Sequence, residues 1–216
     1  MKNKRNKSLA VIILASGSGV RMKNNIPKQY LKIRKKTLLE ENIIKFSSLN
    51  IVKKLIVVVN YKHKKYFNSV KENYKKISFI FGSKTRQESC YKGLKYLEKD
   101  PYTYVFVHDA SRPFISQELI KNLYKKILIK KSAVIPVIAI NDSIKSVNNN
   151  IVLDSLDRKK IYLSQTPQIF NYKLLLNAYK LNKNKLEQFT DDAQIFSLTS
   201  NKVFTIKGSI DNIKVT

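Results

Sequence analysis

Leu9–Leu14 reads LAVIIL, and Ala15-Ser16-Gly17-Ser18-Gly19-Val20-Arg21-Met22 follows it directly. A short apolar run rich in Ile and Val predicts a β-strand that is buried on both faces of a sheet. The two glycines after it let the backbone approach a phosphate closely and present successive N–H groups to it. The stretch therefore predicts a first strand that leads into a phosphate-facing loop.

The loop differs from two common phosphate-binding sequences. The dinucleotide fingerprint GxGxxG fails because Met22 occupies its third glycine position, and the Walker pattern fails because the loop lacks G-K-[ST]. Arg21 lies inside the loop and Lys28 follows in the segment PKQ, so two cations are available to a polyphosphate. An ordinary strand-to-helix turn with Arg21 and Lys28 on the surface is the alternative interpretation.

Further apolar, β-branched runs alternate with helical stretches along the chain. This alternation, with short connections, predicts right-handed βαβ units and an α/β fold: an open, mostly parallel sheet with helices on both faces. We expect one domain over residues 1–216. The predicted strands are 9–14, 55–59, 77–81, 104–107, 133–137 and 202–206, and the predicted helices are 38–49, 62–74, 86–98, 117–130 and 173–184.

Residues 139–161 interrupt the alternation. They hold two short alternating runs around Asn148-Asn149-Asn150, a pattern that is typical of a β-hairpin. We interpret the segment as a projecting β-arm. A hairpin alone is only marginally stable in water, so the arm is expected to contact a partner surface and to form a dimer.

The composition limits the classes of function. One cysteine, Cys90, excludes a disulfide framework and a multi-cysteine zinc site, and it fits a reducing, cytoplasmic compartment. Every apolar run is shorter than the roughly 18 residues of a membrane span, so we expect no membrane partner.

The net charge of +27 raises the question of a nucleic-acid partner. The 42 basic residues are 36 Lys and 6 Arg, beside 20 Asn and 25 Ile. Lys, Asn and Ile have adenine- and thymine-rich codons, so a biased genome produces such a surface without selection for a polyanion. A nucleic-acid reader would also use Arg for bidentate contacts. We expect no specific nucleic acid, and a basic RNA-binding protein is the alternative from another class.

A second motif, VHDASRP, directly follows the fourth predicted strand. Ligands of open α/β sheets bind at the carboxyl ends of the strands, so Asp109 is well placed to hold a Mg²⁺ that bridges triphosphate oxygens. We interpret the preceding His108 as a packed, hydrogen-bonded histidine. A third motif, GSKTRQES at 82–89, opens a helix that Ser83 or Thr85 could cap. Together the motifs predict a basic, hydroxyl-rich site with one metal-holding aspartate, as nucleotidyl transfer needs.

Seven motifs in this order resemble those of the 2-C-methyl-D-erythritol 4-phosphate cytidylyltransferase family of the non-mevalonate isoprenoid pathway. They are LASGSGVRM, PKQY, TRQES, VHDASRP, TPQIF, TDDA and DNIKVT, and the resemblance covers about residues 9–216. It implies a Rossmann-like sheet, a homodimer formed through the β-arm, and the use of CTP with Mg²⁺. The implied reaction transfers CMP from CTP to methylerythritol phosphate and releases pyrophosphate.

The resemblance also implies roles for individual residues, which fall into four groups. Nucleotide contacts are implied for Ala15, Ser16 and Gly17, for Gly82, Ser83 and Ser89 around the cytosine, and for Ala110 beside the ribose. Asp109 would hold Mg²⁺. Arg21 and Lys28 would stabilise the reacting triphosphate, with Lys214 beside the α-phosphate. Methylerythritol phosphate would be bound by Arg112, Ser143, Arg158 and Thr166, partly across the dimer.

The sequence departs from the family pattern in several places. The family loop usually reads A-A-G where this chain has Ser16, and Ser83 replaces the second glycine of a common G-G pair. Ser143 stands where threonine is usual but keeps the hydroxyl. Family members generally continue past DNIKVT into a closing helix, so we expect either a cut chain or fusion to the pathway's cyclodiphosphate synthase. A ribitol 5-phosphate cytidylyltransferase is the alternative within the same class.

Overall fold

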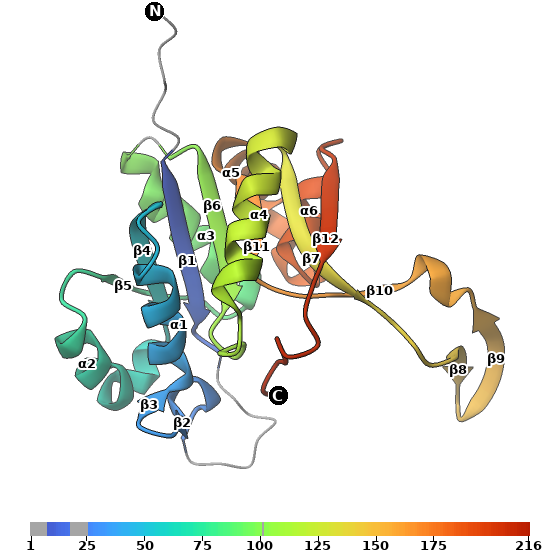
Figure 1. The fold of residues 1–216 in the computed structure, drawn as a ribbon, viewed down its shortest axis with the longest axis horizontal. Helices are drawn as coiled ribbons and strands as arrows, with labels where there is room; N and C mark the ends of the chain where they lie inside the picture. The colour runs from blue at the N-terminus through green and yellow to red at the C-terminus, as the bar shows by residue number, and fades with distance from the viewer. Residues whose placement is uncertain (1–7, 18–25, 101) are drawn as a thin grey trace, which may run out of the picture.

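The strand β1 (Leu9–Ala15) lies between β4 (Val52–Val59) and β6 (Tyr104–Asp109) and runs parallel to both. β5 (Ser78–Phe81) continues the sheet beyond β4, again in parallel. The computed structural model describes residues 8–17, 26–100 and 102–216. Over these residues the strands form one eight-stranded sheet and two small hairpins (Figure 1).

The other half of the sheet is mixed. β11 (Gln168–Asn171) pairs antiparallel with β6 and with β7 (Ala133–Ala139), so β7 runs in the same direction as β1. β10 (Tyr162–Ser164) is antiparallel to β7, and β12 (Val203–Lys207) is parallel to it. The strand order is β10-β7-β11-β6-β1-β4-β5, with β12 beside β7. The prediction of an open, mostly parallel sheet is confirmed.

β1 is the strand at which the order of the sheet reverses, because successive strands of the chain are added first on one side of it and then on the other. From β1 the chain builds outward through β4 and β5, and it then returns to place β6 on the opposite side of β1. Open α/β sheets bind ligands at such a switch point, in the crevice beyond the carboxyl ends of the two strands. The loops after Ala15 and after Asp109 therefore flank the expected binding crevice.

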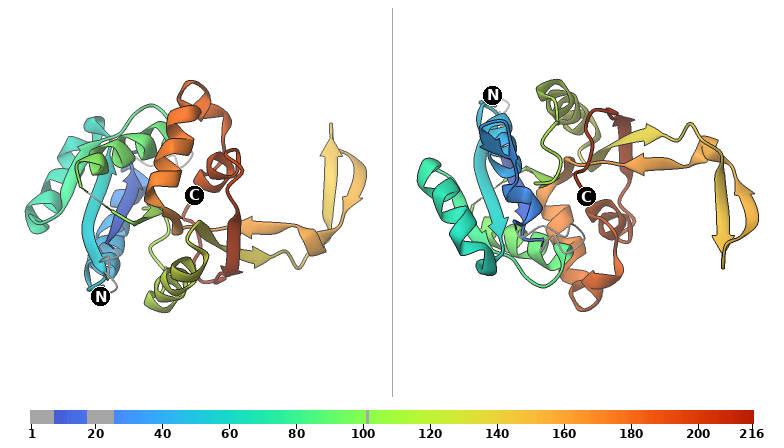
Figure 2. Two further views of the ribbon diagram at one scale, coloured as in Figure 1. Left: turned by 90° about the horizontal axis from the view of Figure 1, so that it is seen from above. Right: turned by 90° about the horizontal axis from the view of Figure 1, so that it is seen from below.

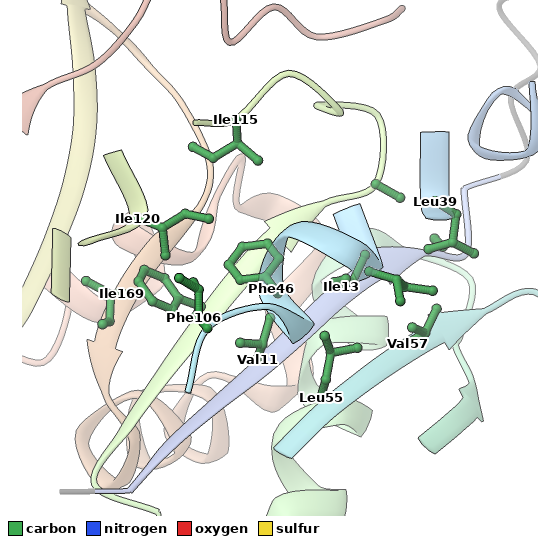
Figure 3. Close-up of a cluster of buried hydrophobic side chains, with 14 of the residues drawn as sticks. Val11, Ile13, Leu39, Phe46, Leu55, Val57, Phe106, Ile115, Ile120 and Ile169 are labelled. Atoms are coloured by element: carbon green, nitrogen blue, oxygen red, sulfur yellow. The ribbon is translucent and has the colours of Figure 1, made fainter. Parts of the chain in front are cut away.

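Side chains of β1 alternate between two apolar layers, because successive residues of a strand point to opposite faces. Leu9, Val11 and Ile13 lie in one fully buried layer, and Ala10 and Ile12 lie in the other. Figure 3 shows Val11 and Ile13 in the first layer. The first layer is covered by α1 (Leu38–Ser47), α2 (Lys64–Asn73) and α4 (Gln117–Lys130). The second is covered by α3 (Arg86–Tyr96), α5 (Tyr172–Leu181) and α6 (Asp192–Ser197).

The starts of α1 and α3 are set by local sequence. Each begins with a capping box, in which a threonine side chain accepts from the N3 backbone and the N3 glutamate accepts from the cap. The pairs are Thr37 with Glu40 and Thr85 with Glu88. Of the two candidate caps in the GSKTRQES motif, Thr85 is therefore the one that is used.

The predicted β-arm is present. β8 (Ile144–Asn148) and β9 (Ile151–Leu156) form an antiparallel hairpin that projects from the body of the molecule (Figures 1 and 2). Asn149 and Asn150, at its turn, have positive φ of 46° and 64°, which a type I′ turn requires and which asparagine tolerates. Three apolar side chains of β9 are about three-fifths exposed: Ile151, Val152 and Leu153.

Most predicted elements are confirmed within a few residues, but the prediction lacks β10, α6 and, between β7 and β6, β11. β11 has only four residues and follows Pro167 directly, so no apolar run of strand length marks it. Among the described residues, no helix combines the length and the apolar character of a membrane span. The remaining elements are β2 (Lys32–Ile33), β3 (Lys36–Thr37) and short 3₁₀ helices at Lys28–Tyr30, Tyr61–His63, Leu97–Lys99, Arg158–Lys160 and Lys183–Gln188.

Candidate active site

A cleft of about 1130 Å³ lies at the switch point of the sheet. It is lined by the loops that follow β1, β4, β5 and β6 and by the last residues of the chain. Many of the residues predicted for the site meet here although they are far apart in the sequence. They are Ala15, Ser16, Gly17, Lys28, Gly82, Ser83, Asp109, Ala110 and Lys214.

The loop after β1 is held in place by two amide side chains. Gln29, which is buried, donates from Nε2 to the carbonyls of Ala15 (2.8 Å) and Gly17 (3.0 Å). Asn60 donates from Nδ2 to the carbonyl of Ser16 (3.2 Å). Three successive carbonyls are thereby fixed from outside the loop, which pre-organises the backbone beside the cleft. Gln29 lies in the PKQY motif, but sequence reasoning gave it no role.

The loops after β1 and β5 are joined through Ser89. Its hydroxyl accepts from Ser16 Oγ and from the Ser83 N–H, both at 2.9 Å, and donates to the Thr85 carbonyl at 2.8 Å. Gly82 packs against the same two serines. A Cβ at this position would lie 2.7 Å from Ser16 Cβ and from Ser89 Oγ, which is too close for any side chain. Ser89 is fully buried and does not line the cleft, so the structure gives it a joining role; its predicted contact with cytosine stays a prediction.

Asp109 stands at the end of β6 and carries two ion pairs. Arg86 Nε lies 2.9 Å from one carboxylate oxygen, and Lys214 Nζ lies 2.8 Å from the other. Burial alone would raise the pKa of Asp109, but the two cations hold this pKa well below its ordinary value. The carboxylate is therefore ionised at neutral pH.

Arg86 belongs to a network that sequence reasoning missed. It is the first residue of α3, and its Nη2 lies 2.8 Å from Oδ2 of Asp192, the first residue of α6. Asp192 is fully buried and accepts from Tyr179 Oη at 2.5 Å. Arg86 thus bridges Asp192 to Asp109. Arg86 belongs to the motif TRQES and Asp192 to the motif TDDA, and only the tertiary fold brings the two side chains together.

His108 is buried beneath the cleft, as predicted. Burial lowers the pKa of His108 to about 3, so the imidazole is neutral at pH 7. Its Nε2 lies 2.8 Å from Asn42 Oδ1, and its Nδ1 lies 3.2 Å from Thr166 Oγ1. The Thr166 hydroxyl also accepts from the Asp109 N–H at 3.1 Å. These internal contacts support the end of β6, and the predicted substrate contact of Thr166 stays a prediction.

The other predicted substrate residues lie outside this cleft. Arg112 donates from Nη1 to the Asn212 carbonyl at 2.7 Å, so it contacts the C-terminal residues. Arg158 sits in a 3₁₀ helix of the arm, where it donates to the Asn141 carbonyl, and Ser143 is exposed near the start of the arm. Arg21 lies outside the described residues.

Comparisons with known proteins show which family the chain belongs to. A family profile described as IspD, 2-C-methyl-D-erythritol 4-phosphate cytidylyltransferase, matches residues 9–216. A cytidylyltransferase of that name from Wigglesworthia glossinidia brevipalpis is 37% identical over 210 residues, which cover 96% of this chain and 90% of the relative. The crystal structure of the Francisella tularensis enzyme of the same name superposes with a TM-score of 0.83 at 31% identity, covering 97% of this chain and 94% of that one.

Bifunctional relatives are longer. The Bifunctional enzyme IspD/IspF of Pelagibacter ubique is 41% identical over 206 residues, which cover 95% of this chain but 53% of the relative. The chain thus spans about half the length of that relative and nine tenths of the Wigglesworthia one. From the profile match and these identities, the chain belongs to the 2-C-methyl-D-erythritol 4-phosphate cytidylyltransferase family, nucleotidyltransferases that transfer CMP from CTP to methylerythritol phosphate in isoprenoid synthesis.

Proposed function

We propose that the cleft between the ends of β1 and β6 is where this chain carries out the cytidylyl transfer of its family. The main support is that five separate stretches of predicted site residues (15–17, 28, 82–83, 109–110 and 214) line one cleft. A phosphate oxygen of methylerythritol phosphate forms a bond to the α-phosphorus of CTP. The bond from that phosphorus to the bridging oxygen of pyrophosphate breaks, and pyrophosphate leaves.

The charges around the cleft fit this reaction. Both reactants are anions, so fixed cations lower the barrier by offsetting their repulsion and by stabilising charge on the reacting phosphate. Lys28 and Lys214 come from opposite ends of the chain and both line the cleft. A phosphate monoester is already ionised at neutral pH, so the attack needs no general base. This agrees with the neutral His108, which is buried rather than exposed to the cleft.

Asp109 is the residue that we assign to Mg²⁺. Its carboxylate is ionised and lines the cleft, and each oxygen retains a lone pair beside the one that faces Arg86 or Lys214. Mg²⁺ is usually held by one or two carboxylates together with substrate phosphates and water. In the described part of the chain no three His, Cys, Asp or Glu side chains gather around a metal-sized space, so one carboxylate fits that pattern. When bound, the ion would neutralise charge on the triphosphate oxygens.

Replacing Asp109 with asparagine should raise the Mg²⁺ concentration needed for half-maximal activity by at least about tenfold, because a neutral amide is a poorer ligand for a hard cation. Activity of the unmodified enzyme should vanish with a chelator and return with Mg²⁺. The measurement is turnover against Mg²⁺ concentration. Asp211→Asn, an exposed carboxylate outside the cleft, is the matched control. An unchanged Mg²⁺ requirement in Asp109→Asn would exclude Asp109 as a ligand of the ion.

We further propose that the enzyme is a homodimer formed through the arm at about residues 139–161. Ser143 and Arg158 lie on the arm and do not line the cleft of their own chain. The exposed apolar side chains of β9 need a partner surface to be removed from water. A second copy of the chain would cover them and bring Arg158 to the neighbouring cleft.

After subunit exchange, an equimolar mixture of Arg158→Ala and Lys28→Ala proteins should recover about a quarter of wild-type turnover. Half of randomly paired dimers are mixed, and one of the two sites in each mixed dimer holds both native residues. The two purified variants would be mixed in equal amounts, allowed to exchange subunits and then assayed. Each variant alone is the control and should stay inactive. No recovery in the mixture, or a monomeric mass by light scattering at micromolar concentration, would contradict the arm's role.

The polyol phosphate is tested by comparing substrates. Turnover of CTP is measured with methylerythritol phosphate and with ribitol 5-phosphate, which separates the family's reaction from that of a ribitol 5-phosphate cytidylyltransferase. The comparisons favour neither this alternative nor an RNA-binding protein. A preference for ribitol 5-phosphate would overturn the proposed substrate. We also propose that the enzyme is cytoplasmic and that it is either fused to the cyclodiphosphate synthase of the same pathway or works beside a separate one; the Pelagibacter relative is named as a bifunctional enzyme, IspD/IspF.

A further inference from the structure

We propose that Gln165 and Asn212 are positioning residues for Lys214. They hold the C-terminal segment, residues 208–216, across the end of the sheet so that Lys214 meets Asp109 in the cleft. The segment contains no helix or strand, so no regular element sets the direction of Lys214. The inference rests on the catalytic role proposed above for Lys214.

Gln165 binds the start of the C-terminal segment as a backbone strand would. Its Oε1 accepts from the Ser209 N–H at 3.2 Å, and its Nε2 donates to the Ser209 carbonyl at 2.8 Å. Nε2 also lies 3.3 Å from the Asn212 carbonyl. Gly208 makes the approach possible, because a Cβ there would lie 2.4 Å from Gln165 Oε1. Gln165 is itself buried, so these bonds are shielded from competition with water.

Asn212 holds the middle of the segment. It is fully buried, and its Nδ2 donates to the Thr166 carbonyl at 2.9 Å. Its own carbonyl accepts from Arg112 Nη1 at 2.7 Å. One residue beyond Lys214, the Val215 N–H donates to the Ser111 carbonyl at 2.9 Å. The backbone is therefore fixed on both sides of Lys214.

This fixation matters because a lysine side chain has a long, flexible stem. An ammonium on four methylene groups loses much rotamer freedom when it is placed at one point, and a fixed backbone reduces the number of positions that it can reach. With the backbone held at Asn212 and Val215, Lys214 Nζ lies 2.8 Å from Asp109 Oδ2. Displacements of about 1 Å at a reacting centre can cost about a hundredfold in rate. Gln165 and Asn212 therefore act on the reaction through Lys214.

The test is a double-mutant cycle between Gln165 and Lys214. Gln165→Leu keeps the size of the side chain and removes its amide. We expect it to lower kcat by about 10- to 100-fold in the native background, and by less than about twofold when Lys214 is already alanine. Hydrogen–deuterium exchange of the free enzyme should show faster exchange in residues 208–216. Asp211→Asn, an exposed substitution in the same segment, should change neither kcat nor the hydrogen–deuterium exchange of residues 208–216.

The outcomes separate this inference from the proposed function. Equal loss of kcat in both backgrounds would mean a general structural role for Gln165 and would overturn the inference, as would native turnover and native exchange in Gln165→Leu. Near-native turnover of Lys214→Ala would instead overturn the proposed role of Lys214, whereas the exchange reading would still report whether Gln165 holds the segment. If Gln165→Leu does not fold, Gln165→Glu is subjected to the same cycle, because it keeps the acceptor for Ser209 and loses the donor.

Discussion

Replacing Lys28 with alanine is expected to lower kcat by about 10²- to 10³-fold, the loss that follows removal of one preorganised electrostatic donor. Lys28 begins the short helix that follows the loop after β1, and it lines the cleft. Its neighbour Gln29 anchors that helix to the carbonyls of Ala15 and Gly17, so the position of residue 28 is set by the backbone. The measurement is steady-state turnover of CTP and methylerythritol phosphate with the purified variant.

The matched control is Lys32→Ala, which removes an exposed lysine four residues further along the chain that does not line the cleft. Both variants should melt within about 2–4 °C of the native enzyme, because exposed or half-buried lysines contribute little to stability. Near-native kcat in a folded Lys28→Ala enzyme would exclude a role in transition-state stabilisation. Equal losses of kcat in the two variants would indicate a long-range electrostatic effect of the lysines rather than a specific contact of Lys28 with the triphosphate.

The second large effect concerns stability. Arg86→Met should lower the free energy of unfolding by about 3–5 kcal/mol, the usual cost of removing one partner of a buried ion pair. Arg86 is the shared cation of Asp109 and Asp192, and Asp192 is fully buried. Without Arg86, Asp192 keeps the neutral hydroxyl of Tyr179 as a hydrogen-bond partner but loses its cation. Urea unfolding at constant pH measures the change, and Lys84→Met, two residues earlier and exposed, is the control.

The pH dependence distinguishes lost charge pairing from lost packing. The pKa of Asp109 is held low in the native fold, so its contribution to stability is present above the ordinary aspartate pKa of about 3.9 and is lost as pH falls through the folded value. In Arg86→Met, Asp109 loses one of the two cations that hold its pKa down, so its carboxylate takes up a proton at higher pH than in the native enzyme. The difference in stability from the native enzyme should therefore shrink between about pH 7 and pH 4. A difference that stays constant with pH would indicate packing alone.

Local patterns carried most of the fold prediction. Apolar runs located β1, β4, β6 and β7 because a strand buried on both faces must be apolar on successive residues. An apolar run also located β5, although this strand lies at the edge of the sheet and is only half-buried. The Asn149-Asn150 turn was predictable because few residues adopt positive φ at two successive positions. β11 was missed because its four residues are placed by pairing with β6 and β7 rather than by an apolar run of their own.

The site was less predictable, because its contacts join distant parts of the chain. Asp109 was located by its place after a strand, but its partner Lys214 lies 105 residues away, and Arg86 and Asp192 are separated by 106. The resemblance to a family supplied residue types for the site but not which atoms they face. Ser89 and Thr166 show the difference, since both hydroxyls take part in internal hydrogen bonds that no sequence pattern describes.

The contact around Ser89 has an evolutionary consequence. Ser16 fills part of the space into which a side chain at position 82 would project, and its hydroxyl bonds to Ser89. Where the family carries alanine at position 16, that bond is absent and Ser89 loses one of its partners. A larger residue at 82 is excluded in either case by the atoms of its two neighbours. Substitutions at positions 16, 82 and 89 are therefore expected to be coupled, because a change at any one of them alters the contacts of the other two.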